Sequence, residues 1–183
     1  PQQLSVAEVA ALVGEREPMP ELFVTAFAPS SAATGESGAF EGAWTAAALL
    51  SVSPRADRLL HAALIGGMLG ADGRALPTQR AAVLIHKYAP RGAVLRQLAR
   101  PEPEVLTAAI WTATARDLIV VYAGEGPRTV AVDCVGVGSP LLVRGEQVMA
   151  GGELRTGDRP NSPRQSIEFD GPGVAVVQFV TDL

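Results

Sequence analysis

The sequence contains few residues that cross-link a chain or bind metals. Its 183 residues include one cysteine, two histidines and one lysine. The single Cys134 excludes an intramolecular disulfide, so nothing in the sequence calls for an oxidising compartment. His61 and His86 lie on separate predicted helices, and neither has a second ligand three or four residues away, as in zinc-binding helices. We therefore expect no metal ion and no cofactor.

Long hydrophobic runs are also missing. The longest strongly apolar stretch, residues 59–69, is about half of the roughly 20 residues that a membrane span needs. We therefore expect no membrane span. The sequence starts at Pro1 without an initiator Met or a signal-peptide pattern, so we expect a fragment of a longer protein. The cytoplasm is the default location, and secretion or association with the cell envelope stays open.

Charge is distributed in blocks, although the whole chain carries only −4. Residues 53–116 hold nine basic and four acidic side chains, a net charge of +5, whereas residues 1–52 and 117–183 carry −5 and −4. We expect the basic block to dock on the acidic flanks. Binding to a nucleic acid or an anionic membrane is the other interpretation, but aromatic residues are sparse and the chain is acidic overall.

Arginine supplies 14 of the 15 basic side chains, and asparagine occurs once. This composition is typical of a high-GC bacterium. It resembles that of conserved mycobacterial proteins of unknown function, some of them encoded near type VII secretion systems. The short signatures of that system are absent, since Trp44 is followed by Thr45 and Ala46 where a Trp-x-Gly motif needs glycine. The resemblance implies no active-site residues.

Apolar spacing and capping residues predict helices in the first part of the chain. The predicted ranges are 6–15, 44–50, 54–69 and 77–88, with a further helical stretch over 94–98. Residues 22–27 favour a strand, although Pro20 and Glu21 could also start a helix. Residues 28–43, rich in Ser, Gly and Ala, predict a flexible loop.

The second part of the chain favours strands. Residues 118–122 and 129–135 are β-prone and flank a Gly- and Pro-containing turn, which predicts a hairpin. Further strands are predicted over 141–143, 166–169 and 174–180, and a second flexible loop over 151–166. Residues 105–114 are ambiguous, because acids and prolines before them favour a helix start, but Ile110 to Thr114 favour a strand, which we prefer.

These elements predict an α+β fold with a helix-rich N-terminal part packed on a mostly antiparallel C-terminal sheet. We expect one domain over residues 1–183. It could divide into a mainly helical part, 1–104, and a mainly β part, 105–183.

Familiar catalytic patterns are not found. Cys134 sits between valines in a predicted strand, which disfavours a reactive thiolate. Gly136 and Gly138 follow a strand, but the residues after them depart from a phosphate-binding loop. His61 and His86 are the only catalytic candidates that we single out.

Three arginines in the predicted loop 151–166 are candidate anion ligands. Arg155, Arg159 and Arg164 could converge on a phosphate or carboxylate, although solvated loops also need such side chains.

The sequence therefore favours a protein-interaction or scaffolding domain with an unidentified protein partner, rather than an enzyme. The alternative is an enzyme that binds a small ligand or phosphate between the helices and the sheet, using His61, His86, Arg155 and Arg159. A second alternative is binding of an anionic nucleic acid or membrane through residues 53–116. Oligomeric state does not follow from the sequence.

Overall fold

The computed structural model describes residues 23–27, 38–52, 58–61, 67–89, 93–97, 102 and 104–181. Its helices are α2 (Ala39–Val52) and α3 (Pro77–Tyr88). The strands are β1 (Phe23–Phe27), β2 (Arg58–His61), β3 (Leu95–Gln97), β4 (Val105–Trp111), β5 (Ala115–Tyr122), β6 (Arg128–Asp133), β7 (Leu142–Val148), β8 (Leu154–Arg159), β9 (Arg164–Phe169) and β10 (Gly173–Val180). This arrangement confirms the predicted α+β class.

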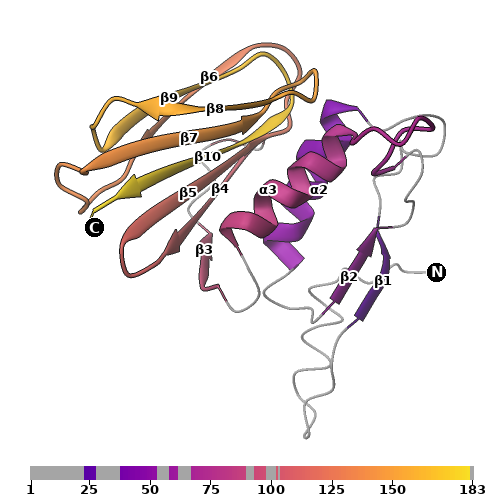
Figure 1. Cartoon of the computed structure of the whole chain (residues 1–183), viewed down its shortest axis with the longest axis horizontal. Helices are drawn as coiled ribbons and strands as arrows, with labels where there is room; N and C mark the ends of the chain where they lie inside the picture. Colours follow the sequence, from indigo (N-terminus) through magenta and orange to yellow (C-terminus); the bar gives the residue numbers. More distant parts are fainter. Residues whose placement is uncertain are drawn as a thin grey trace, which may run out of the picture.

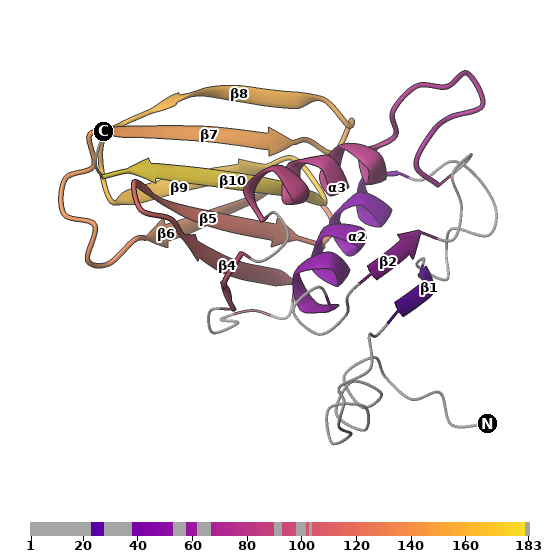
Figure 2. The same ribbon diagram turned by 60° about the horizontal axis from the view of Figure 1, so that its bottom comes forward.

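Three layers make up the main body of the molecule. The central layer is a six-stranded antiparallel sheet in the order β3-β4-β5-β10-β7-β8. Helices α2 and α3 lie side by side on one face of it, and the two-stranded sheet β6-β9 covers the other face (Figures 1 and 2). The parallel pair β1-β2 lies on the far side of the helices.

The core is built on the two middle strands, β5 and β10, which are buried on both faces. Alternate residues of a strand point to opposite faces, so each strand supplies two cores. Ile119 and Val121 face the helices, whereas Leu118 and Val120 face β6-β9. Each of these two strands therefore needs a nearly continuous run of apolar residues.

The two helices approach each other closely because a glycine faces the start of α3. A Cβ atom at Gly42 would lie 3.0 Å from the backbone carbon of Pro77. Pro77 is the first residue of α3, a position where proline costs no hydrogen bond. Ala81, Leu84 and Ile85 then form the face of α3 that packs into the core.

Two helix predictions were wrong. Residues 58–61, predicted within the helix 54–69, form β2, which pairs in parallel with β1. Residues 94–98 were predicted as helix, but Leu95–Gln97 form the edge strand β3. Short apolar runs suit a strand as well as a helix, and only a neighbouring strand decides between them.

The predicted hairpin was also wrong, although both of its strands exist. β5 pairs with β4 and β10, whereas β6 belongs to the other sheet and pairs with β9. The turn between them therefore crosses from one layer to the other. Local turn residues predict that the chain turns, but they do not determine which strands then pair.

The predicted loop 151–166 contains regular structure. Leu154–Arg159 form β8, and β9 begins at Arg164. β8 is exposed along nearly its whole length, so it needs no alternation of apolar and polar residues. Its polar sequence therefore gave no sign of a strand. The predicted loop 28–43 was wrong at its end, because α2 begins at Ala39, and residues 28–37 lie outside the described residues.

Most other element predictions were confirmed. The helices predicted over 44–50 and 77–88 correspond to α2 and α3, and residues 105–111 form strand β4. The strands predicted over 22–27, 141–143, 166–169 and 174–180 correspond to β1, β7, β9 and β10. The helix predicted over 6–15 lies outside the described residues. None of the described helices is long and apolar enough to cross a membrane.

Phe179 tests the core between the sheets. It is fully buried in the cluster that joins β10 to β6-β9. We expect Phe179→Ala to lower the free energy of unfolding by about 3–5 kcal/mol, because a large cavity replaces the ring. Urea denaturation measures this loss. Val135→Ala is the control, because Val135 is 90% exposed, and a loss as large there would contradict the assignment.

Candidate functional site

Two grooves flank the small sheet β6-β9, because two strands cannot cover a face made of six. On the β4 side lies a mainly apolar cavity of about 650 Å³, here called the apolar groove. On the β8 side lie two neighbouring cavities of about 370 and 330 Å³ that share Arg155 and Glu168. We call this second pair the polar groove.

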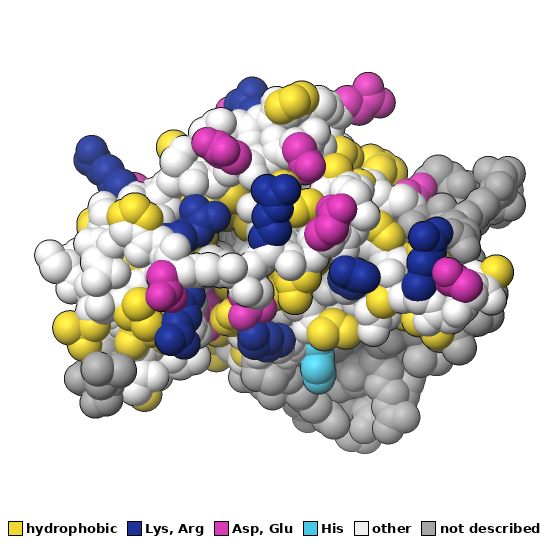
Figure 3. Space-filling view, turned by 45° about the horizontal axis from the view of Figure 1, so that its top comes forward, with side chains coloured by type: hydrophobic (Ala, Val, Ile, Leu, Met, Phe, Trp, Pro, Cys, Tyr) yellow, Lys and Arg dark blue, Asp and Glu magenta, His cyan; other side chains and the backbone are white. Residues whose placement is uncertain are grey.

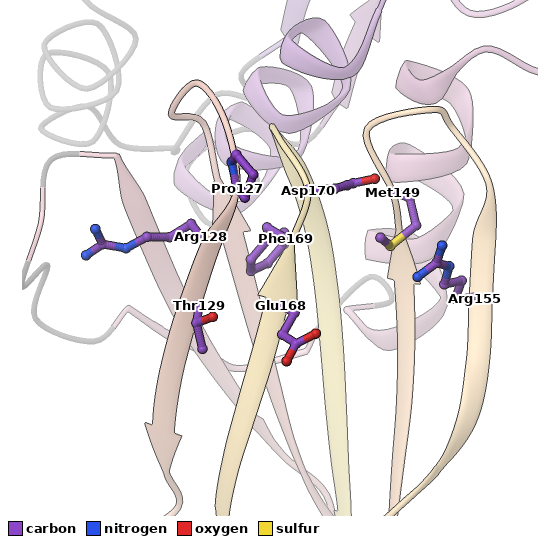
Figure 4. A pocket seen from close by; sticks show the side chains of 8 residues that line it. All are labelled: Pro127, Arg128, Thr129, Met149, Arg155, Glu168, Phe169 and Asp170. Carbon is purple, nitrogen blue, oxygen red and sulfur yellow. The ribbon is translucent and has the colours of Figure 1, made fainter.

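The polar groove runs between the β7-β8 ribbon and β9. Figure 4 shows Met149 and Arg155 on the β7-β8 side, and Glu168 and Phe169 on β9. The side chain of Arg128 points away from this cavity and forms an ion pair with Glu102. The groove is therefore lined by groups from strands that are distant in sequence.

Two facing glycines leave space at the base of the polar groove, because they have no side chains. Gly145 on β7 lies opposite Gly157 on β8, so neither strand projects a side chain there. The side chain of Arg159 lies across this gap, since a Cβ atom at Gly145 would come within 2.3 Å of its Nε atom. The Arg159 guanidinium donates a hydrogen bond of 3.0 Å to the carbonyl of Ser166 on β9.

Charges in the polar groove are close to balanced. Arg155 and Arg159 face the groove together with the exposed acids Glu168 and Asp170. Within the described part of the chain, Arg155 makes no ion pair with a carboxylate. Basic and acidic side chains are also intermixed on the face drawn in Figure 3. Such a surface offers many donors and acceptors and favours a neutral, hydroxyl-rich ligand over a strongly charged one.

The predicted anion-binding arginines do not converge on one point. Arg155 and Arg159 lie in the same groove, but Arg164 forms an ion pair of 2.9 Å with Asp133 and lines neither groove. Sequence reasoning missed Glu168 on β9, Asp170 just after it, and the two facing glycines. Their only signal was the polar alternation of residues 164–169, which the surrounding prolines and glycines obscured.

The predicted catalytic histidines lie on different elements. His86 is an exposed residue of α3 and lines none of the three cavities described above. His61 belongs to β2, not to a helix, and its side chain lies outside the described part of the structure. Among the described residues, no three His, Cys, Asp or Glu side chains group as metal ligands would.

Cys134 lies in the wall of the apolar groove. It is a free thiol, and burial raises its pKa, only partly offset by the charge of Arg116. It is therefore a weak nucleophile at neutral pH.

A buried carboxylate lies on the helix-facing side of the sheet, outside the polar groove. Asp117 on β5 is only 4% exposed, and its Oδ1 atom accepts no hydrogen bond from the described residues. Burial raises the pKa of Asp117, while a hydrogen bond from Gln178 on β10 lowers it. Asp117, Gln178 and Arg144 form one row across β5, β10 and β7.

Comparison with known proteins shows which solved structures share this fold. Neither a protein-family model nor a curated protein matches the sequence. Among solved structures, the chain is similar to a GH30 endoxylanase from Clostridium papyrosolvens, with a TM-score of 0.67 and 10% identity over 98% of this chain. It is also similar to a family 44 xyloglucanase from Paenibacillus polymyxa, with a TM-score of 0.69 and 9% identity over 96% of this chain. A GH51 α-L-arabinofuranosidase from Thermotoga petrophila matches with a TM-score of 0.69 and 12% identity over 94% of this chain.

These similarities correct the functional expectation. Three glycoside hydrolase families share the fold, so the expectation of an interaction or scaffolding domain was wrong, and the alternative of a ligand-binding enzyme is better supported. The three described cavities border β6-β9, however, rather than lying between the helices and the sheet. The chain spans 47%, 35% and 47% of the lengths of these three structures.

Asp117 gives a pH-dependent prediction. Because its folded-state pKa is raised, the charged carboxylate destabilises the fold, and stability falls as pH rises from about 4 through the raised pKa. We expect Asp117→Asn to be more stable than the parent at pH 7, with the difference vanishing in acid. Chemical denaturation from pH 3 to 8 measures this.

The matched control is Asp158→Asn, in the same cross-strand row but exposed, where we expect little change. A loss of stability at pH 7 in Asp117→Asn would show instead that the carboxylate is well satisfied.

Proposed function

We propose that this chain is part of a longer glycoside hydrolase and that its layered sheets bind a polysaccharide along the polar groove. One observation carries the proposal: folds from three glycoside hydrolase families match at least 94% of the chain. The similarity extends over nearly the whole chain, rather than over one common motif.

The parallel pair β1-β2 supports membership in a longer protein. Parallel strands occur almost only in larger sheets that helices cover on both faces, joined by helical crossovers. Here, among the described residues, each of the two strands has only the other as a neighbour, and the segment between them contains α2. The pair therefore has the form of one βαβ unit of a larger parallel sheet.

We assign the polar groove to binding rather than to bond cleavage. Glycosidases use two carboxyl groups, and the general acid keeps its proton because apolar surroundings raise its pKa. Glu168 and Asp170, the acids that face the groove, are both exposed to solvent instead. The hydrolytic pair of the whole protein would then lie outside the polar groove.

The dimensions and chemistry of the groove suit a neutral polysaccharide. Arg155 and Arg159 are four residues apart on an extended strand, roughly 13 Å, which spans more than one sugar ring. Sugar hydroxyls both donate and accept hydrogen bonds, so they can pair with guanidinium groups on one wall and with Glu168 and Asp170 on the other. Bonds to charged partners are the stronger kind.

Substitution of Arg155 tests the binding role. We expect the chain to bind soluble xylan, xyloglucan or arabinan without releasing reducing sugar, and Arg155→Ala to weaken that binding about tenfold or more, since a charged hydrogen bond is lost. Affinity gel electrophoresis with each polysaccharide measures the shift, and a reducing-sugar assay measures cleavage.

Arg164→Ala is the matched control, because Arg164 is an arginine of β9 that lines neither groove. We expect it to bind like the parent. Absence of binding to all three polysaccharides, or equal weakening in both variants, would contradict the proposal.

A further inference from the structure

One edge of β6 has no strand beside it among the described residues. β6 pairs only with β9, and the backbone amide of Cys134 donates a hydrogen bond of 3.0 Å to the carbonyl of Pro163. Antiparallel strands alternate, so the amides of Val130 and Val132 also point towards β9. Those of Thr129, Ala131 and Asp133 point towards the opposite edge.

This free edge faces the apolar groove. All eight residues from Val130 to Val137 line the cavity. Consecutive residues of β6, whose side chains alternate between its two faces, line one cavity only if the strand presents its backbone edge to it. The other wall is formed by the inner faces of β4 and β5, including Thr107, Ala109 and Leu118.

The mouth of the groove carries positive charge. Trp111, at the end of β4, is 56% exposed. The guanidinium carbons of Arg96 and Arg116 lie 4.4 Å and 5.4 Å from its ring centroid. Within the described ranges, neither arginine forms an ion pair with a carboxylate, so the mouth is complementary to an acidic side chain.

We propose that the apolar groove holds an extended polypeptide strand that hydrogen-bonds to the free edge of β6. The strand would alternate apolar side chains into the groove and place one carboxylate near Arg96 and Arg116. Its source would be another part of the same longer protein. That source rests on the proposed function, in which this chain is about a third to a half of an enzyme.

A strand fits the groove better than an apolar small molecule does. The cavity of about 650 Å³ is within the roughly 300–1,000 Å³ typical of ligand sites, so size alone does not decide. The outward-pointing backbone groups of Thr129, Ala131 and Asp133 favour a strand over an apolar molecule, because covering them with hydrocarbon would leave hydrogen-bond donors and acceptors unpaired. A strand pairs them, and it also covers an edge that otherwise invites aggregation.

The test uses a synthetic peptide of alternating threonine and valine with one terminal glutamate. We expect it to slow hydrogen exchange at the amides of Thr129, Ala131 and Asp133 at least tenfold at saturation, measured by NMR. The amides of Val130 and Val132, which already bond to β9, should change little. We also expect slower alkylation of Cys134, the single thiol of the chain, at pH 8.5.

Proline substitution on the free edge supplies the variant. Ala131→Pro removes an outward-pointing amide and leaves the β9 ladder in place, so it should abolish the protection. The matched control is Leu154→Pro on β8, where the bond from the Met149 amide to the Glu153 carbonyl leaves the Leu154 amide facing outward. This variant should bind the peptide like the parent.

A second variant guards against misfolding of Ala131→Pro. Arg96 is exposed at the mouth of the groove. We expect Arg96→Glu to lower the affinity for the glutamate peptide roughly threefold to fivefold, and to raise the affinity for a peptide with lysine in place of the glutamate. The proposal is overturned if the peptide gives no protection at millimolar concentration. It is equally overturned if laurate, or a peptide with a central proline, protects as well as the strand peptide.

Polysaccharide binding measured on the same protein separates the two proposals. Loss of strand binding with intact glycan binding would overturn only the strand site, whereas the reverse result would overturn only the glycan role of the polar groove.

Discussion

The pairing of β5 with β10 is the constraint on which the rest of the structure depends. Eight residue pairs join these strands, and both are buried on both faces. Their alternating side chains form two separate cores, one under α2 and α3 and one under β6-β9. Both faces of the sheet must therefore be covered, since either face left exposed would place a row of apolar side chains in water.

The grooves follow from how incompletely one of those layers covers the sheet. The strands β6 and β9 cover the middle of one face, where apolar burial is greatest, and leave strips beside β4 and β8. On the β8 side the strip is polar, because β8 is exposed and needs no apolar residues. On the β4 side it is apolar, because Val105 and Leu118 still belong to the core. The same mismatch in width thus produces two grooves of different chemistry, for which we propose a polysaccharide and an extended strand as ligands.

Parts of the fold could be predicted from local sequence alone. Pro77 and the apolar spacing after it predicted α3, and the runs at 118–122 and 174–180 predicted the central strands, because burial on both faces requires such runs. The site was less accessible. Arg155 and Arg159 were identified as loop residues. The facing glycines Gly145 and Gly157 and the acid Glu168 form a groove only when β7, β8 and β9 lie together.

The sequence by itself determined the class of the fold, the positions of its buried strands and the absence of a disulfide within these 183 residues, since these depend on composition and periodicity. Only the tertiary structure decided that 118–122 pairs with 173–180 rather than with its neighbour 129–135, and that 58–61 is a strand. Strand pairing is a contact between distant segments, chosen by which faces can be buried together, and no local pattern contains that information. The grooves cannot be predicted from local sequence either, because each is a gap between strands that come together only in the folded chain.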